Sequence, residues 1–332
     1  MVLLVSTEDD EHGRAVGERL SAMGRRWGRV SAMEVGSGLG YAIDPLAADF
    51  GMSRWCVAVA GEAGAVEIGV EEIESIYWRR PIRSGEALME SHPCAEELSC
   101  AEGMAAFRQA MACFERSKFP LGHPDAIREA DNKLKQLRLA REAGFEVPET
   151  RVGNEPGELA AFVARHEFCV VKPLKHGVVF EAANRSEVAT SLWCREFPAA
   201  VLLEHLKGAK SVQMLVQQAV KKVADWRITV LPGRTICCRI DTSRLPKGEP
   251  DWRKRTMELT HQIIEVSAAF EGKLRRYLEL IDIPAGYFDF AVTAEGVPIF
   301  LEMNPNGQWL WMEQLTGYPI SEEIAKALVK QS

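Results

Sequence analysis

The chain of 332 residues exceeds one typical domain and suits two or three lobes around a shared cleft. Its hydrophobic share of 47% and charged share of 26% are those of an ordinary globular protein. The net charge of −7 provides no overall basic field, which argues against nucleic-acid binding. No apolar run approaches about 18 residues, and the N-terminus lacks the basic start and long apolar core of a signal peptide. We therefore expect a cytoplasmic protein without a membrane span.

The first 80 or so residues alternate strand and helix patterns. Strands are expected at 2–6, 55–60, 66–70 and 73–81, and an amphipathic helix is expected at 13–23. The segment "VGSGLG" has the glycines of a phosphate loop without the spacing of a dinucleotide fingerprint, so it is interpreted as a flexible connection. Residues 95–118 have a helical pattern that ends before a loop with two prolines.

The eight cysteines are placed like core residues. None belongs to a Cys-x-x-Cys pair or to a histidine cluster, and several lie in apolar runs such as "WCVAVA" and "FCVVKP". Reduced thiols are therefore expected rather than disulfides or zinc ligands. The positions are 56, 94, 100, 113, 169, 194, 237 and 238.

A new unit is expected to begin near residue 119. The run "PDAIREADNKLKQLRLAREAG" has a helical pattern that stops at Gly144. Its expected caps and apolar positions are Asp125, Asp131, Leu134, Leu137 and Ala140.

A second helix at about 156–166 precedes "EFCVVKP", a short buried strand that ends in Lys172. Lysine at the end of an apolar strand is most often a surface residue whose stem lies on apolar neighbours. The alternative is a cation that faces a ligand.

Residues 212–240 predict a strand, a connector and a hairpin that turns at Pro232-Gly233. The connector carries Lys221, Lys222 and Asp225, and the basic loop "DWRKR" follows the hairpin. A solvated charge run would explain either basic segment alone. Five cations precede the last two strands, however: Lys133, Lys172, Arg227, Arg239 and Arg253.

The last two strands form a predicted hairpin. "YFDFAV" has strand composition, and a second strand resumes at Val297. The dipeptide at 295–296 (Glu-Gly) suits a two-residue turn, which needs positive backbone angles. If Ala294 pairs with Val297, counting back along both strands places Asp289 directly opposite Glu302.

Two carboxylates that face each other across a sheet destabilise it, unless a cation lies between them. Glu302 and Asn304 are two residues apart in a strand and therefore share a face. Mg²⁺ prefers a few carboxylate oxygens together with substrate phosphates. Asp289, Glu302 and Asn304 thus form a candidate magnesium site that is open to a nucleotide, with a purely structural role as the alternative.

The order of these motifs resembles the ATP-grasp superfamily of carboxylate ligases. The resemblance covers roughly 119–330 and rests on the lysine-bearing helix, "VVKPL", "DWRITV" and the aspartate followed by Glu-x-Asn. "IYWRRP" and the ending "NPNGQWLW" are more narrowly similar to the microviridin or graspetide synthetases, which cyclise ribosomal peptides. The resemblance implies an α/β (α+β) protein, with an ATP-grasp fold behind an N-terminal Rossmann-like domain. The expected parts are 1–118, a central lobe at 119–220 and a C-terminal lobe at 221–332.

The resemblance also implies a role for individual residues. Lys133 and Lys172 match the two lysines that hold the nucleotide phosphates. Arg253 matches the arginine that meets the γ-phosphate and the acyl phosphate, and Arg227 and Arg239 are its expected companions.

The nucleotide base and the metal are assigned in the same way. Gln218, Ala219 and Val220 match the hinge that reads adenine through backbone groups, and Asp225 matches a ribose or hinge contact. The resemblance implies ATP and two Mg²⁺ ions as cofactors, with Asp289, Glu302 and Asn304 as the metal ligands.

Two features depart from the family pattern. The segment "LKHGVVFEAAN" after Lys172 has one glycine where many relatives carry a glycine-rich flap, and Ala219 stands where an aromatic residue is common. His123, His176 and His261 pair with no serine or cysteine in a nucleophile motif and are expected to be structural or surface groups.

The implied reaction is phosphorylation of a carboxylate by ATP, followed by attack of a nucleophile on the acyl phosphate. Such chemistry needs positioning and charge neutralisation more than a protein nucleophile. The expected partner is a precursor peptide with a leader, and the hairpin at 228–240 is one candidate docking surface. The acid would be an Asp or Glu side chain, and a Ser, Thr or Lys side chain would attack it. A homodimer is compatible with the sequence.

Two other functions stay open on the sequence. One is a ligase for amino acids or glutamate-type tails, similar to glutathione synthetase, and the other is a nucleotide-binding module without turnover. A binding module need not retain a complete set of metal ligands, which argues against the last.

The paired tryptophans after the turn, Trp309 and Trp311, have two interpretations. They pin the C-terminal segment onto the core, or they brace the turn behind Asn304 and form a wall beside the acceptor site.

Overall fold

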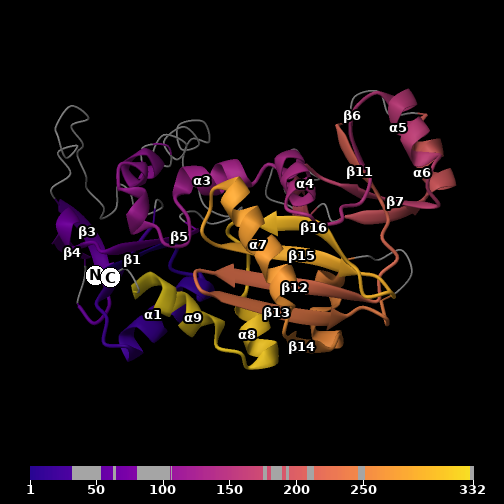
Figure 1. Ribbon diagram of the computed structural model, residues 1–332. Helices are drawn as coiled ribbons and strands as arrows, with labels where there is room; N and C mark the ends of the chain where they lie inside the picture. The colour runs from indigo at the N-terminus through magenta and orange to yellow at the C-terminus, as the bar shows by residue number, and fades with distance from the viewer. Residues whose placement is uncertain are drawn as a thin grey trace.

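The structure, a computed structural model, has three main sheets (Figure 1). An N-terminal sheet and a C-terminal sheet lie side by side, and a smaller middle sheet with two helices projects from the end away from the N-terminus. The expected mixed α/β class is confirmed. The residues described are 1–31, 54–62, 65–80, 105, 107–174, 178–180, 189–191, 194–207, 213–245 and 251–329.

The N-terminal sheet has the strand order β4-β3-β2-β1-β5. β1 is parallel to both β2 and β5, whereas β3 is antiparallel to β2 and β4. The sequence predicted each strand except β2, and helix α1 ends two residues before Gly24, which has a φ of 68°. The bounds are β1 Val2–Ser6, α1 Glu11–Ala22, β2 Trp27–Val30, β3 Arg54–Val59, β4 Ala65–Gly69 and β5 Ser75–Arg80.

The first part of the expected helix at 95–118 lies outside the described residues, as does the glycine-rich segment at 35–40. Within the expected helix, residues 107–112 are helical and Arg116–Lys118 form a 3-10 turn. His176 also lies outside the described residues, as does part of the flap segment.

The run after residue 123 forms two helices where the sequence predicted one. His123 caps α3 (Pro124–Ala130), and Asn132 caps α4 (Lys133–Glu142) by accepting from the amides of residues 134 and 135. The expected caps Asp125 and Asp131 were therefore wrong. Leu134 is 52% exposed, because the break rotates the buried face of α4 to Gln136, Leu139 and Ala140.

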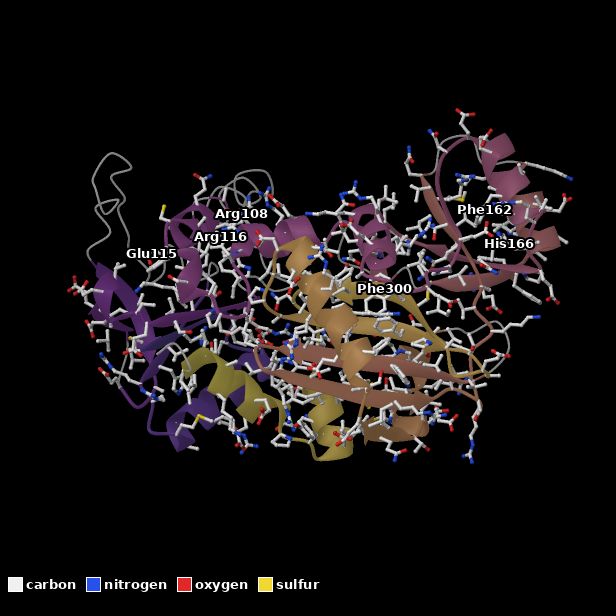
Figure 2. All side chains as sticks on the ribbon, viewed as in Figure 1. Arg108, Glu115, Arg116, Phe162, His166 and Phe300 are labelled. Carbon is white, nitrogen blue, oxygen red and sulfur yellow. The ribbon has the colours of Figure 1, made fainter. Side chains whose placement is uncertain are left out.

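The middle sheet has the order β10-β7-β11-β6 and is covered by α5 and α6. Its core includes Phe162, whose ring lies 4.8 Å from that of His166 in the projecting lobe (Figure 2). The bounds are β6 Thr150–Gly153, α5 Pro156–Val163, β7 Phe168–Lys172, β10 Arg195–Pro198, α6 Ala199–Leu206 and β11 Met214–Gln218. A separate two-stranded sheet pairs β8 (Val178–Phe180) with β9 (Ala189–Ser191).

The C-terminal sheet has the order β14-β13-β12-β15-β16, with α7 across one face (Figure 1). An aromatic cluster that includes Phe288, Phe290 and Phe300 fills the space under α7 (Figure 2). α4 packs on the same layer, beside β16. The bounds are β12 Ala224–Leu231, β13 Arg234–Asp241, η4 Trp252–Glu258, β14 His261–Ile264, α7 Ala268–Ile281, β15 Gly286–Val292 and β16 Pro298–Asn304.

The last hairpin confirms the predicted pairing of Asp289 with Glu302, although its turn differs from the prediction. The loop between Thr293 and Val297 has three residues instead of two, and Gly296 takes a φ of 81°. This shifts the register by one residue, and a bulge at Leu301 shifts it back. The two carboxylates therefore face each other because the longer loop and the bulge compensate, and not because the turn has two residues.

The C-terminal segment returns to the N-terminal sheet. Helices α8 (Leu310–Thr316) and α9 (Ile320–Val329) follow β16, and α9 packs against α1 (Figure 1). Trp309 is fully buried in a core shared by both sheets, and its indole N–H donates to the Tyr77 hydroxyl at 3.4 Å. Trp311 is half-buried and packs against Trp252, with ring centroids 4.8 Å apart.

The described cysteines are free, as expected. Cys169, Cys237 and Cys238 are buried, and Cys113 and Cys194 are partly buried. In the part of the chain that the structure describes, no helix is long and apolar enough to cross a membrane.

We expect Trp309→Ala to lower the free energy of unfolding by about 3–5 kcal/mol, because it empties a fully buried site between two sheets. Trp311→Ala should cost clearly less, since its ring is only half-buried. Urea unfolding followed by circular dichroism measures both losses. Equal losses would contradict the pinning role of Trp309.

Candidate functional site

A row of charged side chains crosses one face of the C-terminal sheet. Arg227 of β12 pairs with Asp289 of β15, which in turn pairs with Glu302 of β16. Asn304 lies two residues beyond Glu302 on the same strand. The sheet register therefore brings together an arginine, two carboxylates and an amide from three adjacent strands.

Arginine side chains neutralise the two facing carboxylates. Arg253, from the 3-10 segment η4, donates from Nη2 to Asp289 Oδ2 and to Glu302 Oε1, both at 3.0 Å. Arg227 donates from Nη1 to the same Asp289 oxygen at 2.7 Å. These contacts offset the repulsion that the register alone would create.

The two predicted lysines approach the same carboxylates from other elements. Lys133, the first residue of α4, lies 3.9 Å from Glu302 Oε2 and donates to the Pro173 carbonyl at 3.1 Å. Lys172 ends β7 in the middle sheet, directly before Pro173. The site therefore lies where α4, the middle sheet and the C-terminal sheet meet.

The pKa shifts record this crowding of charge. Burial lowers the pKa of the partly exposed Lys172, while Glu302 acts in the opposite direction. Burial alone would raise the pKa of Glu302, but Arg253, Lys172 and Lys133 lower it to about 2. Glu302 is therefore ionised at neutral pH, and Lys172 has a cost of charging that an anionic ligand would reduce.

Asp225 lies on the same face of β12 as Arg227, two residues before it, and forms an ion pair with Lys222. Burial raises the pKa of Asp225 to about 6, and Lys222 opposes this rise. The predicted hinge residues Gln218, Ala219 and Val220 connect the middle sheet to the C-terminal sheet. The amide of Ala219 donates to the Phe168 carbonyl at 3.1 Å, which ties the connection to β7.

The structure does not bring Arg239 to this cluster. Arg239 pairs with Trp226 across β12 and β13, whereas Arg227 pairs with Cys238. Neighbouring residues of a strand point to opposite faces, so Arg239 lies on the face that carries α7. There it is 3.8 Å from Asp241.

The hairpin at 228–240, expected as a docking surface, is mostly core. Its strands are inner strands of the sheet, and most of its apolar side chains are buried. Pro232, Gly233 and Arg234 at the turn are its exposed residues.

Gln136 is a supporting residue that the sequence did not reveal. Its buried amide donates to the Met303 carbonyl at 2.7 Å and accepts from the Met303 N–H at 3.1 Å. Met303 lies between Glu302 and Asn304, so this bidentate contact fixes the edge strand that carries both site residues. The spacing of three residues from Lys133, one helical turn, was the available signal.

Asp251 is a second residue that was missed. It caps η4 by accepting from the Arg253 N–H at 3.1 Å, and its other oxygen lies 3.5 Å from Arg253 Nη1. The thiol of Cys194 donates to this second oxygen at 3.6 Å, and burial together with Asp251 raises its pKa to about 11. Aspartate is a preferred capping residue, and its position two residues before Arg253 was the available signal.

The donor set fits a hard divalent cation. Asp289 Oδ1 is buried and has no hydrogen-bond partner among the described residues. Asn304 Nδ2 lies 3.5 Å from both Asp289 Oδ2 and Glu302 Oε1, and a half-turn of the amide would present its oxygen instead. Two carboxylates and one amide oxygen are ligands that Mg²⁺ accepts beside phosphate. The described residues contain no group of three or more His, Cys, Asp or Glu side chains that could hold a metal ion, so the candidate site consists of two carboxylates and the amide of Asn304.

Comparison with known proteins gives structural matches alone. No protein-family model and no curated protein matches the sequence. The macrocyclase MdnC bound with precursor peptide MdnA from Microcystis aeruginosa MRC is 21% identical, with a TM-score of 0.84 over 100% of this chain and 99% of that chain. The Chryseobacterium gregarium RiPP-associated ATP-grasp ligase, in complex with ADP and a leader and core peptide, is 22% identical. Its TM-score is 0.84 over 100% of this chain and 97% of that chain.

A third similar structure is the ATP-grasp ligase PsnB, complexed with a phosphomimetic variant of a minimal precursor, Mg and ADP. It is 20% identical, with a TM-score of 0.75 over 99% of this chain and 98% of that chain. Similarity at this level of identity identifies a fold. Over its whole length, the chain has the fold of the RiPP-associated ATP-grasp ligases.

Proposed function

We propose that the protein is an ATP-dependent ligase that cyclises a ribosomal precursor peptide. It would phosphorylate Asp or Glu side chains of the peptide and join them to Ser, Thr or Lys side chains as esters or amides. The observation that carries this proposal is the cluster in which Arg253 bridges Asp289 and Glu302 beside Lys133 and Lys172.

The charge balance of the cluster supports a polyanionic ligand. Four cations, Lys133, Lys172, Arg227 and Arg253, converge from four different elements onto the carboxylates of Asp289 and Glu302. Such an excess of positive charge favours binding of a nucleotide triphosphate, whose transfer chemistry depends on positioning and charge stabilisation. The described site has no serine or cysteine nucleophile activated by histidine, and this reaction requires none.

Each residue would have a separate task in this reaction. Lys133 and Lys172 would hold phosphate oxygens, and Arg253 would move from the carboxylates to the transferred phosphoryl group. Asp289, Glu302 and Asn304 would hold Mg²⁺, which would neutralise charge on the phosphates. Gln218, Ala219 and Val220 would contact the base from the connection between the lobes, with Asp225 near the ribose.

The peptide partner is proposed from the structural neighbours. MdnC, PsnB and the Chryseobacterium ligase are each described with a precursor peptide or its leader and core. The deciding experiment incubates the protein with Mg·ATP and either precursor peptides or free amino acids. ADP release with loss of one water per crosslink in the peptide mass supports the proposal. ADP release with free amino acids alone would replace it with an amino-acid ligase.

Glu302→Gln tests the metal assignment. The substitution keeps the size of the side chain but removes an anionic ligand, so Mg·ATP turnover should fall by orders of magnitude with the fold retained. A coupled ADP-release assay measures turnover, and circular dichroism checks the fold. Near-normal turnover in the folded variant would remove Glu302 from the metal site.

Lys172→Ala tests the phosphate contact. Loss of one charge-assisted hydrogen bond should weaken nucleotide binding about tenfold or more. Titration calorimetry with Mg·ADP measures the affinity. Lys221→Ala is the matched control, because Lys221 is 86% exposed and pairs with Glu167 at the surface. Equal affinities of the two variants would favour the surface-lysine alternative.

The low pKa of Glu302 predicts a pH dependence of stability. A carboxyl whose folded pKa is about 2, against an ordinary value of 4.5, stabilises the fold above pH 4.5 and loses this contribution as the pH falls toward 2. Without Mg²⁺ or nucleotide, the stability difference between wild type and Glu302→Gln should therefore shrink on acidification. Urea unfolding between neutral pH and about pH 3 measures it. A difference that is independent of pH would contradict the ion-pair origin.

A further inference from the structure

Two motifs at opposite ends of the sequence meet inside the protein. Arg79, near the end of β5, is 1% exposed and donates from Nη1 to three oxygens of the turn after β16. The acceptors are the Asn306 carbonyl at 2.8 Å, Asn306 Oδ1 at 3.0 Å and the Gly307 carbonyl at 2.9 Å. The Asn306 amide donates back to the Arg79 carbonyl. Arg79 of "IYWRRP" and residues 306–307 of "NPNGQ" therefore form one hydrogen-bonded unit.

The turn occupies a position where α/β sheets usually bind a ligand. After β1 and α1, the chain continues to β2, which lies on one side of β1. Strand β5 lies on the other side of β1. The crevice beyond the carboxyl ends of such strands is the usual ligand position. Here Asn306 and Gly307 contact Arg79 at the end of β5, and Asp10, the cap of α1 after β1, lies 3.6 Å from Arg79 Nε and balances its charge.

From this turn, a continuous chain of contacts leads to the charged row. The carbonyl of Gln308 accepts from Arg227 Nη2 at 3.0 Å, and Arg227 Nη1 holds Asp289 at 2.7 Å. A side chain at Gly307 would have its Cβ 2.6 Å from Arg227 Nη2 and from the Tyr287 Cβ, so the backbone must pass close to both. The position of the turn therefore determines the orientation of Arg227.

We propose that Arg79 is a positioning residue for the proposed ligase site. It would hold the turn at 305–308 so that Arg227 and Asn304 keep their places beside Asp289. The N-terminal sheet would then contribute to turnover through a buried arginine that does not touch the reactants. The effect on turnover rests on the proposed function, whereas the holding of the turn does not.

Arg19 provides a matched control for simple docking of the N-terminal part. It also links this part to the C-terminal segment, through Ser321 at 3.1 Å and Glu313 at 3.5 Å, but it lies away from the turn. If Arg79 only attached the N-terminal sheet to the C-terminal segment, the loss of Arg19 would lower turnover in the same way.

The experiment compares Asn306→Ala, Arg79→Lys, their double variant and Arg19→Ala. Hydrogen exchange of the full chain, read by mass spectrometry on the segment 304–312, reports the turn without any ligand. We expect exchange there to rise about tenfold or more in Asn306→Ala and Arg79→Lys and less than about twofold in Arg19→Ala. Asn306 is partly buried, so Asn306→Ala decides the question even if Arg79→Lys does not fold.

Turnover is measured on the same variants. For Asn306→Ala we expect kcat to fall about tenfold or more, with KM for ATP changed less than about threefold, because the base and phosphates contact other residues. The double variant should be no slower than the slower single variant, since both break one unit. Arg19→Ala should keep kcat within about twofold for equal folded fraction.

Three results would overturn the proposal: unchanged exchange at 304–312, equal loss of kcat in Arg19→Ala and Asn306→Ala, or additive losses in the double variant. A wild-type protein without nucleotide turnover would refute the proposed function instead. In that case, the exchange data alone would decide whether Arg79 holds the turn.

Discussion

The pairing of Asp289 with Glu302 is the constraint on which the site depends. Two carboxylates that face each other on adjacent strands destabilise the sheet unless positive charge lies beside them. The protein supplies this charge from four places: β12, η4, the start of α4 and the end of β7. α4, η4 and the end of β7 thus each bring a cation to the same pair of carboxylates. Under the proposed function, the guanidinium of Arg253 would leave the carboxylates to a metal ion and would contact a phosphate.

Support for this constraint comes from outside the charged row itself. β16 is an edge strand, and edge strands have a free row of backbone groups. The side-chain amide of Gln136 satisfies two of these groups, because it hydrogen-bonds to both the N–H and the carbonyl of Met303. On the other side, the turn after Asn304 is held by Arg79. The strand that carries Glu302 and Asn304 is thus fixed along its edge and at its end.

Local pattern was sufficient for much of the fold and for the core of the site. Strand composition located β7, β12, β13, β15 and β16, and counting across the hairpin paired the two carboxylates. That count was correct because two deviations cancel, a longer loop and a bulge at Leu301. Single-sequence patterns contain no information about such compensation, since a bulge depends on packing of the neighbouring strand.

The errors arise where a face or a partner is decided by tertiary contacts. The family resemblance grouped Arg239 with Arg227. In the sheet, however, Arg239 pairs with Trp226, the strand neighbour of Arg227, and therefore lies on the opposite face, which carries α7. Leu134 was placed in the core by a helical pattern that the break at Asp131 and Asn132 interrupts. Arg79 contacts Asn306, 227 residues later in the chain, and no local pattern marks that contact. For Gln136, the spacing from Lys133 points to the same face of α4, but it does not reveal the contact with Met303, 167 residues later.

The long separation between Arg79 and Asn306 has a consequence for how the protein is made. During synthesis, the N-terminal sheet leaves the ribosome well before the turn that fills its crevice and before α9, which covers α1. Contacts of such sequence separation close late, because the entropy of a long loop must be overcome first. Until then, the guanidinium of Arg79 lacks its contacts with the turn, and the apolar face of α1 lacks its contacts with α9. The contacts of the turn with Arg79 and Arg227 therefore form only after the whole length of chain from β5 to the turn has been synthesised.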